Sequence, residues 1–350
     1  MSAKQTRKTS PSDVSPRGFD KELAELQALA ASLKTGAAPD PQAIDHLRKA
    51  LAHRNNFLVS KAAKLVADAE LSSLLPDVLA AFDRFFVDAV KSDPQCWAKN
   101  ALAKTLVKLE HRQKDAYLRG LRHHQSEPVW GGSSDTAGAL RATCAHALVD
   151  CPGISDADLL HILLDPLTDT DKTVRMEAAR AIGRVGGVSA ALILRLRAML
   201  GPALRDRDEP EVLGAVYSAL LSVEGASAIP LVAAALKEGD DLAAEAAFAL
   251  ADLRSAEALA ALQMRLGAGA DIWFASVLLS AIALTRLPEA MDFLIAMVAR
   301  EAREAPTAIE AIGRTAPSPE LRARVRQVVE QVDSPRLREA FRLHLPDPAT

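Results

Sequence analysis

Aromatic residues are scarce in this sequence of 350 residues. They make up 4% of the chain although the hydrophobic fraction reaches 49%, so Ala, Leu, Val and Ile supply most of the apolar surface. Such residues pack helices closely and offer few of the aromatic pairs that are typical of strands. No run of alternating apolar and polar residues predicts a strand. The composition therefore favours an all-α fold.

Cysteines are also few. Cys96, Cys144 and Cys151 are odd in number, and no pair of them has the C-x-x-C spacing. This pattern indicates neither a disulfide framework nor a zinc site. We therefore expect core thiols and no bound metal.

Long apolar runs are missing as well. No window holds the roughly 20 uninterrupted apolar residues of a membrane span. Residues 1–18, "MSAKQTRKTSPSDVSPRG", are rich in Ser, Thr, Lys and Pro and lack the apolar stretch of a signal peptide. We expect a disordered tail over 1–18, a cytoplasmic location and no membrane association.

The net charge of -3 is small but unevenly distributed. Residues 1–130 carry 20 Lys and Arg against 15 Asp and Glu, whereas the remainder carries 22 against 30. Neither part is as basic as a dedicated nucleic-acid domain. The asymmetry can still orient a charged partner along the chain.

Helical periodicity dominates from Phe19 onward. Equivalent apolar positions recur at intervals of 30 to 42 residues, which is typical of helical-pair repeats. These anchor positions are Val66, Leu106, Leu148, Ile182, Leu220, Leu250, Ile282 and Ile312. A second column, three residues earlier, is small or apolar and is expected to face the interior. Its members are Ala63, Ala103, Ala145, Ala179, Tyr217, Ala247, Leu279 and Ile309.

One helical pair cannot bury its own apolar face, so neighbouring pairs must stack. We therefore expect residues 19–350 to form a single α-α solenoid of about eight repeats. "SPELRARVRQVVEQ" and "SPRLREAFRLHL" are expected to form a helical cap at its C-terminal end.

The stretch "DTDKTVRMEAARAIGRVGG", residues 169–187, is the clearest copy of the repeat. It resembles the second-helix half of HEAT and HEAT-like (PBS-lyase-type) repeats, in which Asp stands at the turn, Val-Arg follows, and alanines lead to a glycine end. The matching residues are Asp171, Val174, Arg175, Ala178, Ala179, Ile182 and Gly183. The resemblance covers about residues 41–315. It implies an α-α superhelix that serves as an interaction scaffold, and it brings no catalytic residues.

The acidic turn and the following cation of this motif are expected to be structural. Asp171 should cap its helix. Arg175 should bond the turn Asp of its own or the next repeat, because an arginine beside packed alanines would otherwise be buried unpaired. Contact with a ligand is the alternative. The same row contains Lys99 after Asp93 and Arg141 after Asp135.

A third column, two residues before each anchor, is rotated about 100° from the alanines and should project into the groove of the solenoid. In the first four repeats it is basic. Its members there are Lys64, Lys104, His146 and Arg180. Either these side chains form a binding surface, or they only solvate that face.

One polar insertion, "QSEPVWGGSSDTAG", interrupts the third repeat and contains Trp130. Loops inserted into solenoids often contact partners, and exposed tryptophans are common binding hot spots. Trp130 is therefore expected to be a contact residue. The alternative is that its indole folds back over the solenoid as a lid.

No sequence motif predicts catalysis. The chain lacks a G-x-S-x-G elbow, a Walker loop and G-x-G-x-x-G. HEAT-like di-iron hydroxylases carry repeated His-Glu pairs, and no histidine here is followed by glutamate. We therefore expect a protein that is not an enzyme and holds no cofactor.

Three functions remain open. The first is a scaffold that binds a protein partner through its concave face and the loop of the third repeat. The second is nucleic-acid backbone binding by the basic N-terminal half, against which the net charge and the lack of exposed aromatics along the basic column argue. The third is a lyase-like or chaperone-like role on a tetrapyrrole protein, which the resemblance of "VRMEAARAIGRVGG" to phycobilin-lyase repeats implies.

Overall fold

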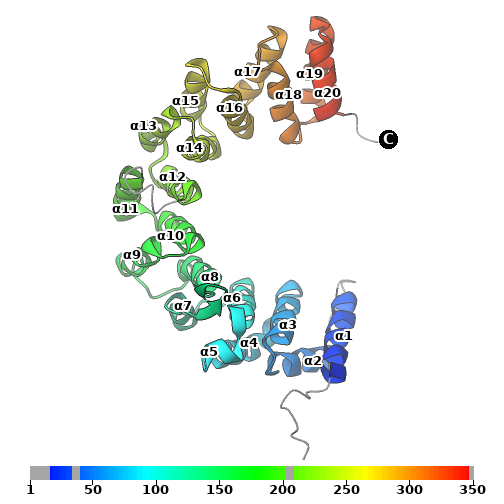
Figure 1. Ribbon diagram of the computed structural model, residues 1–350, viewed down its shortest axis with the longest axis vertical. Coiled ribbons are helices and arrows are strands. Elements are labelled where there is room, and N and C mark those ends of the chain that lie inside the picture. The colour runs from blue at the N-terminus through cyan, green and yellow to red at the C-terminus, as the bar shows by residue number, and fades with distance from the viewer. Residues whose placement is uncertain (1–15, 34–39, 202–208, 347–350) are drawn as a thin grey trace, which may run out of the picture. The chain divides into compact units, whose positions relative to one another are not determined.

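The chain folds into two compact units of helices, residues 1–152 and 153–350 (Figure 1). This computed structural model describes residues 16–33, 40–201 and 209–346. Residues 1–15 of the expected tail lie outside the described residues. Helix α1 begins at Pro16, within the stretch predicted as tail.

The first unit contains eight α-helices and one short hairpin among its described residues. The helices are α1 (Pro16–Leu33), α2 (Pro41–Leu51), α3 (Asn56–Asp68), α4 (Leu75–Arg84), α5 (Ala89–Ser92), α6 (Trp97–Lys108), α7 (Lys114–Leu121) and α8 (Gly138–Leu148). The 3-10 turns are η1 (Ser72–Leu74) and η2 (Pro94–Cys96), and the strands are β1 (Ser126–Val129) and β2 (Gly132–Asp135).

The second unit is helical throughout its described part. Its helices are α9 (Asp156–Leu164), α10 (Lys172–Val185), α11 (Gly187–Leu200), α12 (Pro210–Glu224), α13 (Ile229–Ala234), α14 (Asp241–Asp252), α15 (Ala256–Gly267), α16 (Ile272–Leu284), α17 (Pro288–Ala299), α18 (Ala305–Arg314), α19 (Pro319–Val332) and α20 (Pro335–His344). The 3-10 turns are η3 (Pro166–Thr168), η5 (Gly225–Ala228) and η6 (Ala235–Lys237).

Within each unit, the second helices of successive pairs pack side by side. In the first unit α3 contacts α6 and α6 contacts α8, and in the second unit α10, α12, α14, α16 and α18 follow one another in the same way (Figure 1). The all-α class and the stacking of helical pairs are thus confirmed. Whether residues 19–350 form one solenoid stays a prediction.

The two apolar columns lie in the core, as expected from their spacing. All eight anchors are fully buried, and every member of the column three residues earlier is at most 2% exposed. Because seven of those eight members are Ala, Leu or Ile, the helices approach one another closely.

The expectation of no strand was wrong for residues 126–135. Ser126 pairs with Asp135 and Val129 with Gly132 in an antiparallel hairpin. Its strands carry Pro128 and several serines instead of alternating apolar residues, so pattern alone gives no strand signal. Side-chain contacts with residues outside the two strands hold the hairpin in place.

Gly183 shows how close the stacked helices are. A Cβ atom built on Gly183 in α10 would lie 2.9 Å from the Cβ of Ala219 in α12 and 3.2 Å from its Cα. The glycine of the repeat motif is therefore a contact point between α10 and α12.

We predict that Gly183→Val lowers the free energy of unfolding by about 1–3 kcal/mol, because the added atoms force the two helices apart. Gly267→Val is the matched control, since no atom lies within 4 Å of a Cβ built there. Its stability should not fall, because glycine is the poorer helix former. Urea unfolding followed by circular dichroism measures both, and equal midpoints would contradict the close contact.

Candidate functional site

A buried ion pair lies at the centre of the first unit. The side chains of Asp93 and Lys99 are both fully buried, and Nζ of Lys99 lies 3.0 Å from Oδ2 of Asp93. The same ammonium donates to the backbone oxygen of Phe85 at 3.2 Å. A buried charge is tolerated only when it is paired and hydrogen-bonded, and both conditions hold here.

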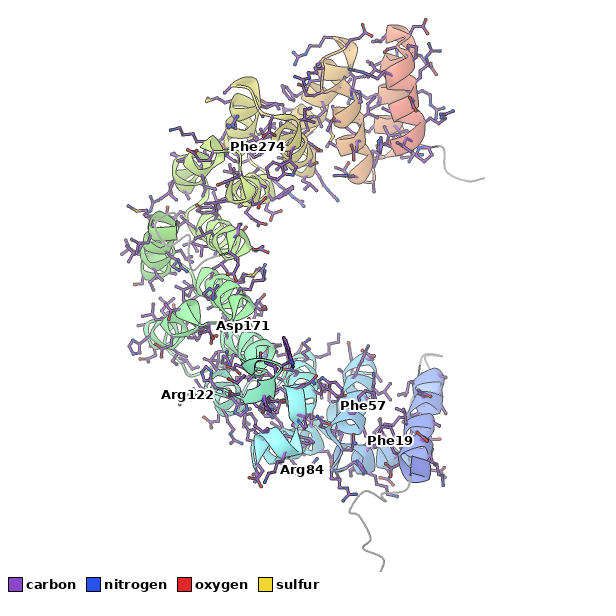
Figure 2. All side chains as sticks on the ribbon, in the orientation of Figure 1. Phe19, Phe57, Arg84, Arg122, Asp171 and Phe274 are labelled. Atoms are coloured by element: carbon purple, nitrogen blue, oxygen red, sulfur yellow. The ribbon has the colours of Figure 1, made fainter. Side chains whose placement is uncertain are left out.

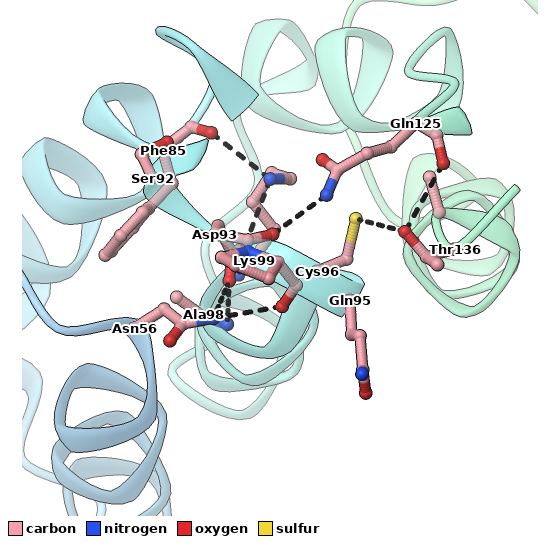
Figure 3. A network of polar contacts seen from close by, with 12 residues as sticks. Asn56, Phe85, Ser92, Asp93, Gln95, Cys96, Ala98, Lys99, Gln125 and Thr136 are labelled. Carbon is pink, nitrogen blue, oxygen red and sulfur yellow. Dashed lines mark hydrogen bonds and ion pairs between the residues drawn. The ribbon is translucent and has the colours of Figure 1, made fainter. Parts of the chain in front are cut away.

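Asp93 joins three separate elements (Figure 3). Its Oδ1 accepts hydrogen bonds from Nδ2 of Asn56 in α3 at 2.9 Å and from the amide of Ala98 in α6 at 2.8 Å, and its Oδ2 accepts the Lys99 amide at 2.9 Å. Its backbone oxygen accepts a hydrogen bond from Nε2 of Gln125, just before β1, at 2.8 Å. One residue thus fixes the starts of α3 and α6 and the base of the hairpin.

The chain reaches α6 through an unusual turn. Gln95 and Cys96 both adopt the left-handed region, with φ of 59° and 53°. For residues other than glycine this conformation costs roughly 1–2 kcal/mol each. The amide of Gln95 donates to Oε1 of Glu127 at 2.7 Å, and the amide of Cys96 donates to the oxygen of Asp93. These contacts hold the turn that places Trp97 at the first position of α6.

Glu127 ties β1 to the same network. Its Oε1 also accepts hydrogen bonds from Oγ1 of Thr136 at 2.7 Å and from Nε2 of Gln125 at 2.6 Å. Burial raises the pKa of Glu127, but these hydrogen bonds outweigh it and hold the pKa below its usual value. The carboxylate therefore remains charged and anchors the strand.

Asp135 closes the hairpin at its other end. Its Oδ2 lies 2.8 Å from Nη1 of Arg141, whose side chain is 1% exposed, and 2.9 Å from Nδ1 of His124. Burial raises the pKa of Asp135, but the amides of Gln125 and Ala137 donate to it, and together with His124 and Arg141 they hold its pKa well below the usual range. Both strands are thus fixed at their base.

Trp130 projects from the far end of this hairpin. Gly131 takes a φ of +89°, which the turn between Val129 and Gly132 requires. Trp130 is fully exposed at 103% of its reference area, and Val129 is 50% exposed. The indole does not fold back as a lid. It stands in solvent on a rigid support.

In the second unit, Asp171 and Arg175 hold the turn before α10, and Arg175 also reaches the next repeat. At the start of α10, Oδ1 of Asp171 accepts a hydrogen bond from the backbone amide of Thr173 at 2.7 Å (Asp171 is labelled in Figure 2). Arg175 donates to the backbone oxygens of Asp169 at 2.6 Å and Thr170 at 3.1 Å, and it pairs with the carboxylate of Glu209. The partner across the repeat is therefore a glutamate, where an aspartate was expected.

A groove of about 660 Å³ lies between α3 and α6. It contains two of the predicted basic residues, Lys64 and Lys104. Its lining consists of Phe57, Ser60, Lys61, Lys64, Ala67, Asp68, Trp97, Asn100, Ala101, Lys104, Thr105 and Lys108. The structure thus brings together part of the basic column and two aromatic rings.

Phe57 and Trp97 were not predicted as site residues from the sequence. They stand seven residues before Lys64 and Lys104, so each pair shares one helix face two turns apart. Their ring centroids are 5.7 Å apart, and Phe19 from α1 lies 6.3 Å from Phe57 (Figure 2). The expectation that the basic column lacks exposed aromatics was therefore wrong for Trp97, which is 46% exposed. The sequence signal that was available is the spacing of seven residues between each aromatic residue and the lysine that follows it.

The other two column residues lie elsewhere. His146 is half-buried on α8. Arg180 in the second unit forms an ion pair with Glu177 on its own helix. The structure does not add either residue to the groove between α3 and α6.

A smaller cavity of about 160 Å³ lies between α1 and α2. His53 lies 3.3 Å from Glu22 and His46 lies 3.6 Å from Glu25, and no sequence pattern predicted these two pairs. No group of three or more metal-ligating side chains gathers among the described residues.

The cysteines are free and buried. Burial raises the pKa of Cys96 and of Cys151 to about 11, and it also raises the pKa of Cys144. Because the thiolate is the reactive form, none of the three is activated as a nucleophile.

Comparison with known proteins gives little. No family model matches the chain, and no curated protein matches it. Among solved structures it is similar to human deoxyhypusine hydroxylase in complex with glycerol, at 18% identity and a TM-score of 0.28, over 78% of this chain and 99% of that one. A match this weak carries no argument about fold or activity. The HEAT resemblance therefore rests on the repeat residues and the helical stacking.

The expectation that the chain is not an enzyme needs correction. It rested on missing sequence motifs, among them the repeated His-Glu pairs of HEAT-like di-iron hydroxylases, whereas a solved structure that matches the chain is that of an enzyme. Missing motifs exclude no activity in a helical protein, so an absence of enzymatic activity does not follow from the sequence. The weak match assigns no reaction to this chain.

One described stretch, Pro210–Lys237, is long and apolar enough to cross a membrane by length and composition, with a mean hydropathy of 1.8. A core helix of a soluble protein passes the same test, so this is weak evidence. The stretch comprises α12, α13 and the turns beside them, with Gly225 at a φ of +59° between the helices. The cytoplasmic location stays a prediction.

We predict that Asp93→Asn lowers the free energy of unfolding by about 3–5 kcal/mol, because it leaves the buried Lys99 ammonium without a counter-charge. Adding Lys99→Met should recover part of the loss, since no unpaired charge then remains. Urea unfolding of the wild type, both single variants and the double variant measures the coupling between the two residues.

The exposed pair of Lys108 and Glu70, 2.7 Å apart, provides the control. Glu70→Gln should leave the urea midpoint unchanged, because exposed pairs contribute little. An Asp93→Asn midpoint equal to that of the wild type would contradict the structural importance of the buried pair.

Proposed function

We propose that the protein is a binding platform for a protein partner and that Trp130 is its main anchor. The observation that carries this proposal is the full exposure of an indole at the tip of a hairpin that is tied into a buried network. Tryptophan is among the residues most enriched in binding hot spots. Exposing so large an apolar group to water has no stabilising effect on the free chain.

The surroundings of Trp130 suit an interface. Val129 adds apolar surface beside it, and Ser133 and Ser134, which are exposed in β2, follow the turn as polar neighbours. An apolar centre with a polar rim is the usual anatomy of a protein–protein interface. We therefore infer that the partner offers an apolar pocket large enough for an indole.

The rigid support of the hairpin favours binding. Gln125 and Glu127 fix one strand, and Asp135 with Arg141 fixes the other. A loop that is already ordered loses little conformational entropy on association. The tip can thus bind without a folding step. No described feature favours the tetrapyrrole alternative, which stays a prediction.

Trp130→Ala tests this proposal. Proteins captured by the immobilised full chain are quantified by mass spectrometry, and the dissociation constant of each captured protein is then measured with purified components. We expect at least one partner to bind about 30-fold more weakly to the variant, as for a hot spot of about 2 kcal/mol.

The matched control is Trp273→Ala, which removes a tryptophan that is 47% exposed in the second unit. It should retain the partner with unchanged affinity. Because Trp130 makes no core contact, the thermal stability of Trp130→Ala should equal that of the wild type. Retention of every partner by Trp130→Ala would refute the proposal.

A further inference from the structure

The groove between α3 and α6 has a chemical polarity along its length. Phe57 and Trp97 lie at the N-terminal ends of their helices, and Lys64 and Lys104 lie seven residues further along, about 10 Å at 1.5 Å per residue. The groove therefore offers aromatic rings at one end and ammonium groups at the other. A ligand that fits it has a flat ring and a negative charge one short linker away.

The lysine charges at this site are available. The lining holds four lysines and one acid, Asp68. Lys108 pairs with Glu70, and Lys61 lies 4.9 Å from the centroid of the Phe57 ring. Lys64 and Lys104 are exposed, and neither forms an ion pair with any residue that the structure describes. Lys64 and Lys104 are thus the lining lysines with neither an ion pair nor a ring contact, and their charges are open to an anionic ligand.

Trp97 is the ring best placed to stack. Its side chain is 46% exposed. Phe57, by contrast, is contacted by Phe19 and by the ammonium of Lys61. Stacking of a base on an exposed aromatic ring is a main source of affinity for single strands.

Asn100 lies between the aromatic and the basic ends, three residues after Trp97 and four before Lys104. Its Oδ1 is buried and accepts no hydrogen bond from the described residues. This oxygen has almost no exposed surface, so it does not select the ligand. A chain of Asp and Glu offers no ring to stack on Trp97, whereas a nucleotide offers both a ring and a phosphate.

We propose that this groove binds single-stranded nucleic acid. One base stacks on Trp97, and the flanking phosphates bind Lys64 and Lys104. A duplex keeps its base faces stacked inside, so it cannot use Trp97 in this way. The site is separate from the Trp130 hairpin and does not depend on the proposed protein partner.

A second groove in the other unit provides an internal contrast. It is lined by Phe248, Trp273, Ser276, Val277, Ser280, Leu284, Ala311, Arg314 and Thr315. Trp273 stands seven residues before Ser280, as Trp97 does before Lys104. Arg314, the cation among these residues, forms an ion pair with Glu310 at 2.6 Å. The same aromatic position is thus present there without unpaired lysines.

The test uses the full chain and a labelled oligo(dT) at low ionic strength, with fluorescence anisotropy as the readout. Binding should weaken as salt rises, with a slope in log K against log salt of about −0.7 for each phosphate contact. Lys64→Ala and Lys104→Ala should each weaken binding and make that slope shallower by about 0.7. Lys91→Ala, which removes an exposed lysine elsewhere in the same unit, should change neither.

Trp97→Ala should weaken binding about 5- to 150-fold, the range for the loss of one stacked base. Trp273→Ala should leave binding unchanged. In the Trp130→Phe/Trp273→Phe double variant, Trp97 is the one tryptophan of the chain, so quenching of its fluorescence by oligo(dT) reports stacking directly.

Several results would overturn the proposal. The first is that oligo(dT) does not bind at low ionic strength, and the second is that none of the groove variants alters its binding. The third is that a duplex, a polyglutamate peptide or a free mononucleotide binds with the same affinity as oligo(dT). Retained oligo(dT) binding by Trp130→Ala would support a separate site and would leave the protein-partner proposal to its own test.

Discussion

The buried pair of Asp93 and Lys99 is the interaction on which the first unit depends most. Removing two charges from water costs several kcal/mol per ion, and only close pairing with further hydrogen bonds compensates for it. Asp93 meets this condition with donors from α3, α6 and the residue before β1. The electrostatic requirement of one carboxylate thus fixes three elements that lie far apart in the sequence.

Both candidate surfaces lie directly on this network. Asn56 precedes Phe57, and Ala98 follows Trp97, so two donors to Asp93 adjoin the two rings of the groove. Gln125 and Glu127 connect the same network to the strand that ends beside Trp130. The left-handed turn at Gln95 and Cys96 also depends on it. Rigid elements at both surfaces therefore share one buried polar centre.

Periodicity in the sequence predicted the helical pairs and their core because burial of an apolar face repeats with the helix. The hairpin was not predictable, since Ser126 and Pro128 give no strand pattern and its stability comes from Gln125, Glu127 and Asp135. The groove was found only in part. Lys64 and Lys104 follow from their column, whereas Phe57 and Trp97 lie two turns away on the same face, beyond the positions that the repeat comparison aligned.

Hydrogen exchange of the wild type and of Asp93→Asn, followed by mass spectrometry, is the most direct test of whether the Asp93–Lys99 pair holds the groove and the hairpin together. If one network holds the groove and the hairpin, exchange should accelerate together in residues 56–60, 95–99 and 125–136. Residues 241–252 in the second unit should remain unchanged. Unaltered protection of the hairpin and of the start of α6 in Asp93→Asn would contradict the central role of this pair.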